Sequence, residues 1–449
     1  MRAARAALTL GASALLLLGN ACSKKKPSGG ERSPQPTPPP ILPRKNYDTA
    51  RLFNGTVFHS RLESSSSGRT ALATLSSPDS YLLDLSLRIA WPEPAVTPGE
   101  LIEATPELST LLPQLPELLK EARPSSAFAT LLQNKEKFLR TNLGSLQKLP
   151  YRDSLFDCQT ILEVPLPQGG PGTVLVQAIM NVNTDGSDGD RNLDLEKLSP
   201  LFQPQTNYRW TKQTSRPNPC LQETEAHVAA VAEKLASGTL TPEQRSECEK
   251  EQTHAKATLE ELKRWSFLVG TADPFIVLPS FMVGKIKGQP GIGDYAIVIA
   301  QGTLYPAVLG DMGPSSKIGE ASLRLCRTID EKSGADHRPA SRPEIVYLVF
   351  PGSADKPLAA PDYAHWSRRC HELWKSLGGS ETAPWHEWTP LEKPWPTPTP
   401  SPEPSADTAS ASPAGTNPAT LPSSPNRITQ PFTPNPSPSS SLPSAPPKQ

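Results

Sequence analysis

The sequence predicts an α+β protein whose strands gather in one part of the chain. Between residues 151 and 394, strand-like segments dominate and a single helical excursion interrupts them. Residues 46–150 begin with strand-like alternation and continue with leucines at near-helical spacing. Both ends are rich in Pro, Ser and other polar residues, so we expect them to be disordered. Because 53 of the 449 residues are proline, the chain has room for only one or two folded domains.

Five segments have the β-branched and aromatic content of strands. They are residues 174–182, 275–278, 295–309, 321–326 and 344–350. Within the third segment, Gln301-Gly302 predicts a tight hairpin turn between residues 295–300 and 304–309.

The helical excursion covers residues 223–235 and 242–262, where small apolar and charged residues alternate. Thr241 is a suitable N-cap and Pro242 suits the first helical position, so these segments predict a helical hairpin, which we expect to flank a cleft. Nearer the N-terminus, residues 83–89 alternate strictly and predict a half-buried strand. Apolar residues between 111 and 139 predict packing helices that prolines cut short.

Two carboxylates stand at the ends of a Gly-rich turn between apolar runs. Asp311 follows the second strand of the expected hairpin, and Glu320 opens the next run. A glycosidase needs one carboxyl group to protonate the leaving oxygen and a second to activate water or attack the sugar. On the residues alone, a solvated turn with a capping Glu is the alternative, and it is the commoner role of acidic residues near glycines.

The run around these carboxylates, GDMGPSSKIGEAS with GDYAIVIA before it, resembles the catalytic segment of the fungal-type chitosanases, glycoside hydrolase family 75. Upstream, NVNTDGSDGD is similar to that family's Asp-Cys-Asp-Gly segment, with Asn183 and Thr184 in place of the first Asp and the Cys. Residues 206–219 and 265–279 extend the resemblance. It implies that Asp311 and Glu320 cleave glucosamine polymers with inversion of configuration. An Asp-containing turn between crossing strands also resembles the double-psi β-barrels, so we expect a double-psi-like barrel core with flanking helices.

The surroundings of the two carboxylates suggest their roles. Glu320 enters an apolar run, so we expect it to be desolvated, to hold a proton at neutral pH and to act as the general acid. Asp311 lies between Gly310 and Gly313 in what we expect to be an open turn, where it would stay ionised and activate water. The exchanged assignment stays open. Inversion implies a separation of about 6.5 to 9.5 Å between the two carboxyl groups.

Further acidic and aromatic residues are candidates for substrate binding. Carboxylates could hold the ammonium groups of chitosan by charge-assisted hydrogen bonds, and aromatic rings could stack on sugar faces. The alternatives are an acidic surface turn and a buried aromatic core. The candidates are Asp185, Asp188, Asp190, Asp294, Tyr208 and Trp210.

We predict no metal and no cofactor. The spacing Asn181-x-Asn183-x-Asp185-Gly186 matches the first half of a calcium loop, but Asn192 at the twelfth position cannot supply the closing carboxylate. No pair of Cys or His residues has the spacing of metal ligands. Residues 151–330 hold 22 acidic and 17 basic residues, which favours a cationic partner over nucleic acid.

The N-terminus predicts export. Arg2 and Arg5 precede an apolar run, and small residues precede Cys22, so residues 1–22 have the pattern of a secretory signal. The cut before Cys22 resembles that of bacterial lipoproteins, in which this Cys is lipidated, and plain secretion is the alternative. Residues 23–45 then form a tether. We expect a monomeric secreted protein or membrane-anchored lipoprotein, in the periplasm, at the outer membrane or at the cell surface, that contacts the membrane through Cys22.

The predicted function is that of an exported endo-glycosidase that hydrolyses β-1,4-glucosaminidic bonds of chitosan. Residues 151–394 would form the catalytic domain, residues 46–150 an accessory region, and residues 395–449 a disordered tail. One alternative is a peptidoglycan-cleaving enzyme, since double-psi barrels with a catalytic Asp also occur in wall-lytic enzymes. Another is a non-catalytic glycan-binding lipoprotein, against which the intact pair of carboxylates argues.

Overall fold

The computed structural model describes residues 56–62, 72, 83–145, 155–166, 172–284 and 288–395, all of which belong to one compact unit of residues 47–449. The predicted signal, the lipidation of Cys22, the tether and the C-terminal tail lie outside the described residues. No described helix is both long and apolar enough to span a membrane.

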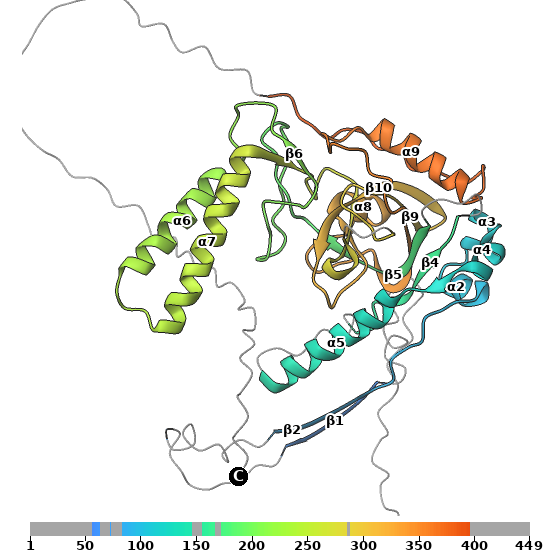
Figure 1. Ribbon diagram of the computed structural model, residues 1–449, viewed down its shortest axis with the longest axis horizontal. Coiled ribbons are helices and arrows are strands. Elements are labelled where there is room, and N and C mark those ends of the chain that lie inside the picture. The colour runs from blue at the N-terminus through green and yellow to red at the C-terminus, as the bar shows by residue number, and fades with distance from the viewer. Residues whose placement is uncertain are drawn as a thin grey trace, which may run out of the picture. The chain divides into compact units, whose positions relative to one another are not determined.

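A closed β-barrel of six strands forms the core (Figure 1). Around the barrel, each strand pairs with the next, and the last pairs with the first. In this order the strands are β5 (Thr173–Asn183), β12 (Ala340–Val349), β9 (Tyr295–Ala300), β10 (Thr303–Gly313), β8 (Phe275–Pro279) and β11 (Glu320–Ser322). The β10–β8 and β11–β5 pairs are parallel and the other pairs are antiparallel. The predicted α+β class with a barrel core is confirmed.

Local chemistry explains the tight hairpin between β9 and β10. Gln301 and Gly302 both have positive φ, 50° and 76°, in a two-residue connection. Such turns match the right-handed twist of the flanking strands, and glycine adopts this conformation without steric cost. Every residue of β9 is buried, which explains its unbroken apolar sequence.

One predicted strand is wrong beyond its first residues. Residues 321–326 were expected to be extended, but β11 ends at Ser322 and the helix α8 (Leu323–Ile329) follows. The Ser322 hydroxyl accepts a hydrogen bond from the backbone N–H of Leu325, which caps the first turn of α8. The apolar residues of this run are buried here and would also be buried in a core strand, so the pattern of so short a run could not distinguish helix from strand.

The helical part of the region before residue 150 packs on the barrel and on the strand beside it. Strands β1 (Thr56–Leu62) and β2 (Leu83–Ile89) pair with each other, and β3 (Arg123–Pro124) pairs with β4 (Cys158–Val164), which extends the sheet from β5. The helices are α2 (Pro98–Ala104), α3 (Leu108–Leu111), α4 (Leu115–Glu121) and α5 (Ser126–Ser145). Their buried leucines, among them Leu101 and Leu131, belong to the same apolar core as the barrel strands. The helices of this region therefore share their core with the barrel.

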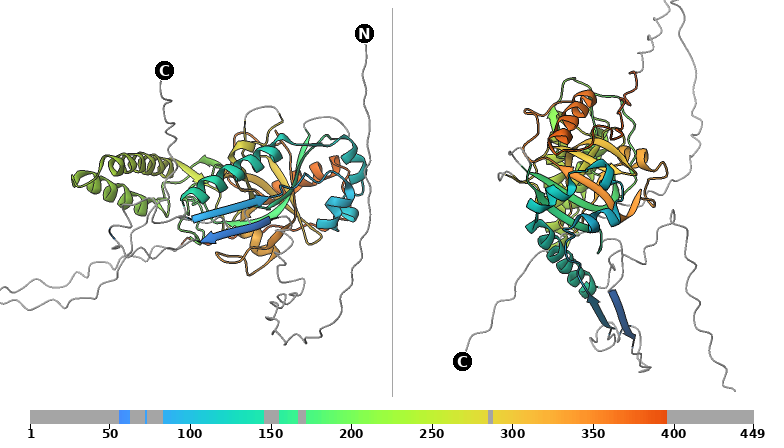
Figure 2. Two further views of the ribbon diagram at one scale, coloured as in Figure 1. Left: turned by 90° about the horizontal axis from the view of Figure 1, so that it is seen from below. Right: turned by 90° about the vertical axis from the view of Figure 1, so that its right-hand side faces the viewer.

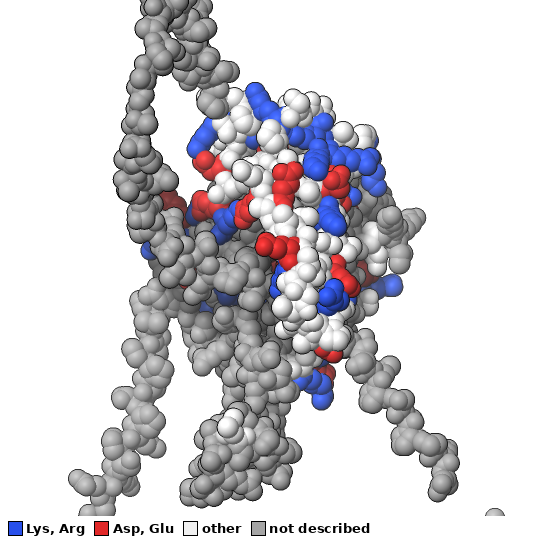
Figure 3. All heavy atoms as spheres, turned by 90° about the vertical axis from the view of Figure 1, so that its left-hand side faces the viewer, with Lys and Arg blue, Asp and Glu red and all other residues white. Residues whose placement is uncertain are grey.

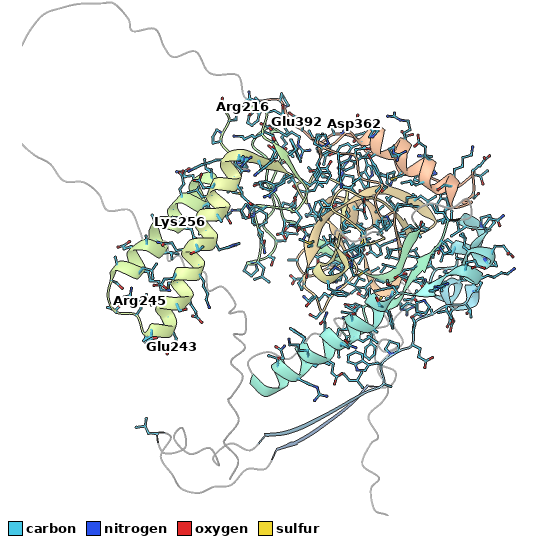
Figure 4. The ribbon with its side chains drawn as sticks, in the orientation of Figure 1. Arg216, Glu243, Arg245, Lys256, Asp362 and Glu392 are labelled. Carbon is cyan, nitrogen blue, oxygen red and sulfur yellow. The ribbon has the colours of Figure 1, made fainter. Side chains whose placement is uncertain are left out.

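The predicted helical hairpin consists of α6 (Leu221–Ala236) and α7 (Pro242–Arg264). Thr241 caps α7, and its side chain accepts from the backbone N–H of Gln244, as expected. The two helices lie side by side and extend away from the barrel (Figure 2), and Glu243 and Arg245 lie at the far end (Figure 4). Acidic and basic side chains intermix on the face that carries the hairpin (Figure 3), as expected for solvated helices.

Three short elements and one helix complete the described chain. Strands β6 (Arg209–Thr211) and β7 (Trp265–Phe267) form a small sheet at the base of the hairpin. The 3-10 helix η4 (Ser280–Met282) follows β8, and α9 (Tyr363–Ser376) packs on β9 and β10.

The cysteines of the described residues are all buried free thiols, at positions 158, 220, 248, 326 and 370.

Candidate active site

A cleft of about 570 Å³ opens beside the barrel. Its walls come from the ends of β5, β10 and β11, from the loop of residues 199–209 and from α7. Asp185, Asp311 and Glu320 all line it, although 126 to 135 residues separate the first from the other two along the chain. The volume is typical of a ligand site, so the fold assembles three predicted residues in one binding cleft.

Asp311 lies on β10, next to an irregularity in the pairing of β10 with β8 between Leu309 and Asp311. The residue is only 8% exposed, and its Oδ1 accepts the backbone N–H of Asn207 at 3.0 Å. Burial, reinforced by the nearby charges of Asp185 and Glu320, raises the pKa of this carboxyl to about 8. The expectation of an open turn with an ionised Asp311 is therefore wrong, because the strand continues through Gly313 and buries the side chain.

Glu320 is the first residue of β11 and is half-buried. Its Oε1 accepts a hydrogen bond from the side-chain amide of Asn183 at 2.9 Å. Burial raises the pKa of Glu320, and the Asn183 hydrogen bond works in the opposite direction. The other oxygen, Oε2, faces the end of β10, since a Cβ built on Gly313 would lie 3.5 Å from it.

Asn183 connects Glu320 to Asp185. Its Nδ2 donates to Glu320 and, at 3.1 Å, to Asp185 Oδ2, while its Oδ1 accepts the backbone N–H of Asp185 at 2.9 Å. This amide oxygen already accepts an N–H group, so it does not face a cation as an oxygen ligand of a calcium loop would. Among the residues that the structure describes, no cluster of three His, Cys, Asp or Glu side chains could hold a metal ion.

Asp185 keeps access to the cleft. It is half-buried, its Oδ1 accepts the backbone N–H of Gln203 at 2.8 Å, and burial raises its pKa. The position of this carboxylate fits the predicted role in substrate binding, because a cation in the cleft could reach it.

Several cleft residues were missed by the sequence analysis. Glu261, near the end of α7, accepts from Arg209 at 2.7 Å, and the hairpin thus flanks the cleft. Lys317, which lies between the two carboxylates in the sequence, also lines the cleft. Leu201 and Met312, 64% and 39% exposed, provide apolar surface at the cleft. The only sign of a further cleft residue in the sequence was Asn183, which stands where the family pattern has Asp.

The structure gives Asp188 and Asp190 structural roles and keeps both out of the cleft lining. The side chain of Asp188 is fully buried and pairs with Arg191 Nε at 2.5 Å, and Arg191 also forms a two-bond ion pair with Asp273. Asp190 accepts the backbone N–H groups of Gln213 and Thr214. The prediction that Asp188 binds substrate is therefore corrected: no surface of its carboxylate is left for a ligand.

Asp294, Tyr208 and Trp210 also lie outside the cleft lining. Asp294 is 2% exposed and accepts the backbone N–H groups of residues 291, 352 and 354, which ties two loops together. The hydroxyl of Tyr208 donates to the carbonyl of residue 359 at 3.0 Å, and its ring contacts Trp210 edge-on. Trp210 is 3% exposed beneath Arg191. These three residues are buried and stabilise the fold, so the prediction that they bind substrate is corrected.

Residues 180–379 match the family model of the fungal chitosanase of glycosyl hydrolase group 75. Over these residues the chain is similar to the group 75 chitosanases. The resemblance inferred from the sequence is thereby confirmed, and the match indicates a glycoside hydrolase with a chitosan-type substrate. The matched residues contain Asp185, Asp311 and Glu320, whereas α2 to α5 precede them. A comparison of the chain with curated proteins finds no match.

Proposed function

We propose that the protein is an exported endo-chitosanase that hydrolyses β-1,4-glucosaminidic bonds with inversion, using Asp311 and Glu320. The main support is the pair of carboxyl groups with raised pKa values that line one cleft from strands β10 and β11. Two carboxyl groups in unlike environments are what acid–base hydrolysis of a glycosidic bond requires.

The surroundings of the two carboxyl groups favour Asp311 as the general acid and Glu320 as the general base. This is the reverse of the roles expected from the sequence. With a pKa of about 8, Asp311 holds its proton at neutral pH and can donate it. Glu320 receives the N–H of Asn183, and a donor of this kind stabilises the ionised form. Glu320 is then suited to be the general base.

The reaction follows from these roles. Asp311 gives its proton to the glycosidic oxygen as the bond to the anomeric carbon breaks. Glu320 takes a proton from a water molecule, whose oxygen attacks the same carbon from the opposite face. The products are two shorter chains, of which the new reducing end has the α configuration. Proton exchange with solvent returns both carboxyl groups to their starting states.

Charge in the cleft supports a cationic substrate. With Asp311 protonated, the cleft still has three carboxylates, Asp185, Glu261 and Glu320, against two basic side chains, Arg209 and Lys317. Because Arg209 is paired with Glu261, Asp185 is the better placed acid to bind an ammonium group.

Export with a lipid on Cys22 would hold the enzyme at a membrane surface, with residues 23–45 as a tether. The support is the signal pattern of residues 1–22. Such an enzyme would meet polysaccharide outside the cytoplasm.

A parallel assay of chitosan, chitin and peptidoglycan tests the proposed activity. We expect new reducing ends from chitosan, and NMR of the early products should show the α-anomer first. If new reducing ends or soluble fragments appear only from peptidoglycan, the wall-lytic alternative is supported instead. A β-anomer as the first product would exclude inversion.

We expect Asp185→Asn to weaken the use of highly deacetylated chitosan more than that of acetylated polymer, because only the former loses an ion pair. Kinetics on both polymers measure this effect. Salt should reduce the wild-type preference in the same way, since charges in water are screened over about 10 Å at 0.1 M ionic strength. Asp194→Asn, at an exposed acid outside the cleft, is the control. Equal losses on both polymers would mean that Asp185 only orients Asn183.

We expect Asn183→Asp to shift the acidic limb of the kcat/KM–pH profile to higher pH. The change replaces a donor to Glu320 by a like charge, which raises the pKa of the base, so a higher pH is needed to ionise it. Asn192→Asp makes the same change outside the cleft lining and should leave the profile unchanged. An unshifted profile for Asn183→Asp would exclude Glu320 as the base.

A further inference from the structure

We infer that Lys135 on α5 is a positioning residue for the active site. It holds the loop between Asp311 and Glu320, although α5 precedes the residues that match the family. This inference rests on the proposed roles of Asp311 and Glu320. It assigns a function in the reaction to a helix that lies outside residues 180–379.

The loop of residues 314–319 connects β10, which carries Asp311, to β11, which begins with Glu320. Lys135 Nζ donates to the backbone carbonyl of Ser316 at 2.8 Å and to Asp157 Oδ2 at 2.7 Å. The same Asp157 oxygen accepts the backbone N–H of Ile318 at 3.2 Å. One buried ion pair therefore holds the loop at two backbone positions. Lys135 donates to the carbonyl of Ser316, and Asp157 accepts the N–H of Ile318.

Neighbouring contacts fix the same loop at its sides. Asn134, beside Lys135 on α5, donates from its Nδ2 to the carbonyl of Ser315 at 3.1 Å. At the end of the loop, the carbonyl of Gly319 accepts the N–H of Asn181 at 2.7 Å. Gly319 has a φ of +75°, and a Cβ there would lie 2.2 Å from the carbonyl oxygen of Ile179. The loop is thus held between α5 and β5, directly before Glu320.

Burial makes this arrangement specific. The side chains of Lys135 and Asp157 are 2% and 1% exposed. A buried ion pair is weak evidence for stability, because well-packed apolar residues of similar volume often serve as well. An apolar pair could not bind the carbonyl of Ser316 or the N–H of Ile318, however. These two bonds fix the path of the loop, which also carries Lys317 into the cleft.

The test compares Lys135→Met with Leu131→Ala in the full chain. Leu131 lies one turn earlier on α5 and is fully buried, so its truncation loosens the helix without removing a bond to the loop. At a temperature where both variants are folded by circular dichroism, we expect kcat of Lys135→Met to fall about 10- to 100-fold, the size of effect that a displacement of about 1 Å can cause. We expect KM to change little, and Leu131→Ala to keep a kcat close to that of the wild type.

Amide hydrogen exchange gives a readout besides activity. The Ile318 N–H should exchange faster in Lys135→Met than in Leu131→Ala, whereas the amides of β9 should exchange alike in both variants. Unchanged kcat together with unchanged exchange at Ile318 would overturn the inference, and equal losses of kcat in the two variants would reduce Lys135 to a structural role.

A second variant covers the case in which Lys135→Met does not fold. The double variant Lys135→Met with Asp157→Leu removes both charges of this ion pair together, and a wild-type kcat in it would also overturn the inference. Asp311→Asn separates this outcome from failure of the proposed function. If that variant is inactive and the Lys135 variants are fully active, only the positioning role fails. If Asp311→Asn is active, the catalytic assignment itself fails.

Discussion

Asp311→Asn and Glu320→Gln are each expected to lower kcat on chitosan at least about 100-fold while leaving the fold intact, as expected for the loss of a general acid or base. Each substitution keeps the shape of the side chain and removes proton transfer. The two residues line the same cleft. Because the proposed mechanism gives them different roles, neither should replace the other. Initial rates of reducing-end release, with circular dichroism of each variant, measure the effect.

The matched control is Asp194→Asn, which neutralises an exposed acid that pairs with Lys393 outside the cleft lining. It should keep wild-type kcat. A loss below about 100-fold in either cleft variant would contradict its assignment as an acid–base group.

Small anions can separate the two roles. Alanine at the position of the base leaves room for azide or formate beside the anomeric carbon, so activity of Glu320→Ala should return on their addition. Asp311→Ala should not respond, because an anion cannot supply the missing proton to the leaving oxygen. Rescue of Asp311→Ala alone would restore the roles that the sequence suggested.

The parts of the fold that the sequence predicted are those in which local chemistry decides. Gln301-Gly302 can take positive φ values, and Thr241-Pro242 caps and begins a helix, whatever lies around them. The segment after Glu320 was misjudged because its conformation depends on one side-chain cap, at Ser322. Short apolar runs carry no period that separates strand from helix.

The candidate site was predictable only as far as the family motif reached. Asp185 and Asp188 have similar neighbours in NVNTDGSDGD, but one lines the cleft and the other is buried. The difference comes from Arg191 and its second partner Asp273, 82 residues further along the chain. Likewise, Glu261 reaches the cleft from a helix whose sequence is that of a solvated hairpin. Contacts between distant segments decide these roles, and no local pattern encodes them.

The raised pKa of Asp311 leads to a prediction about stability: Asp311→Asn should become progressively more stable than the wild type as pH rises from about 4 to 8. In the unfolded chain this carboxyl has its ordinary pKa of 3.8, whereas burial raises it to about 8 in the fold. Between these values the folded state binds the proton and the unfolded state does not, so the stability of the wild type falls as pH rises. Below about pH 4 both states are protonated and the group contributes nothing.

The expected size follows from the interval between the two pKa values. At about 1.4 kcal/mol per pH unit, the loss sums to the order of 5 kcal/mol once pH exceeds the folded pKa. Asn cannot titrate, so its variant escapes this loss, and removal of the charge also relieves repulsion on Asp185 and Glu320. Urea unfolding of the two proteins from pH 4 to pH 9 measures the difference in the free energy of unfolding.

The same ionisation should end catalysis on the alkaline side, because Asp311 can act as an acid only while it holds its proton. The kcat/KM of the wild type is therefore expected to fall above about pH 8, over the interval in which the stability difference reaches its plateau. Asp194→Asn, at an exposed carboxylate outside the cleft lining, is measured alongside as the control. A stability difference between Asp311→Asn and the wild type that does not change with pH would show that Asp311 is ionised in the fold, and would remove it as the proton donor.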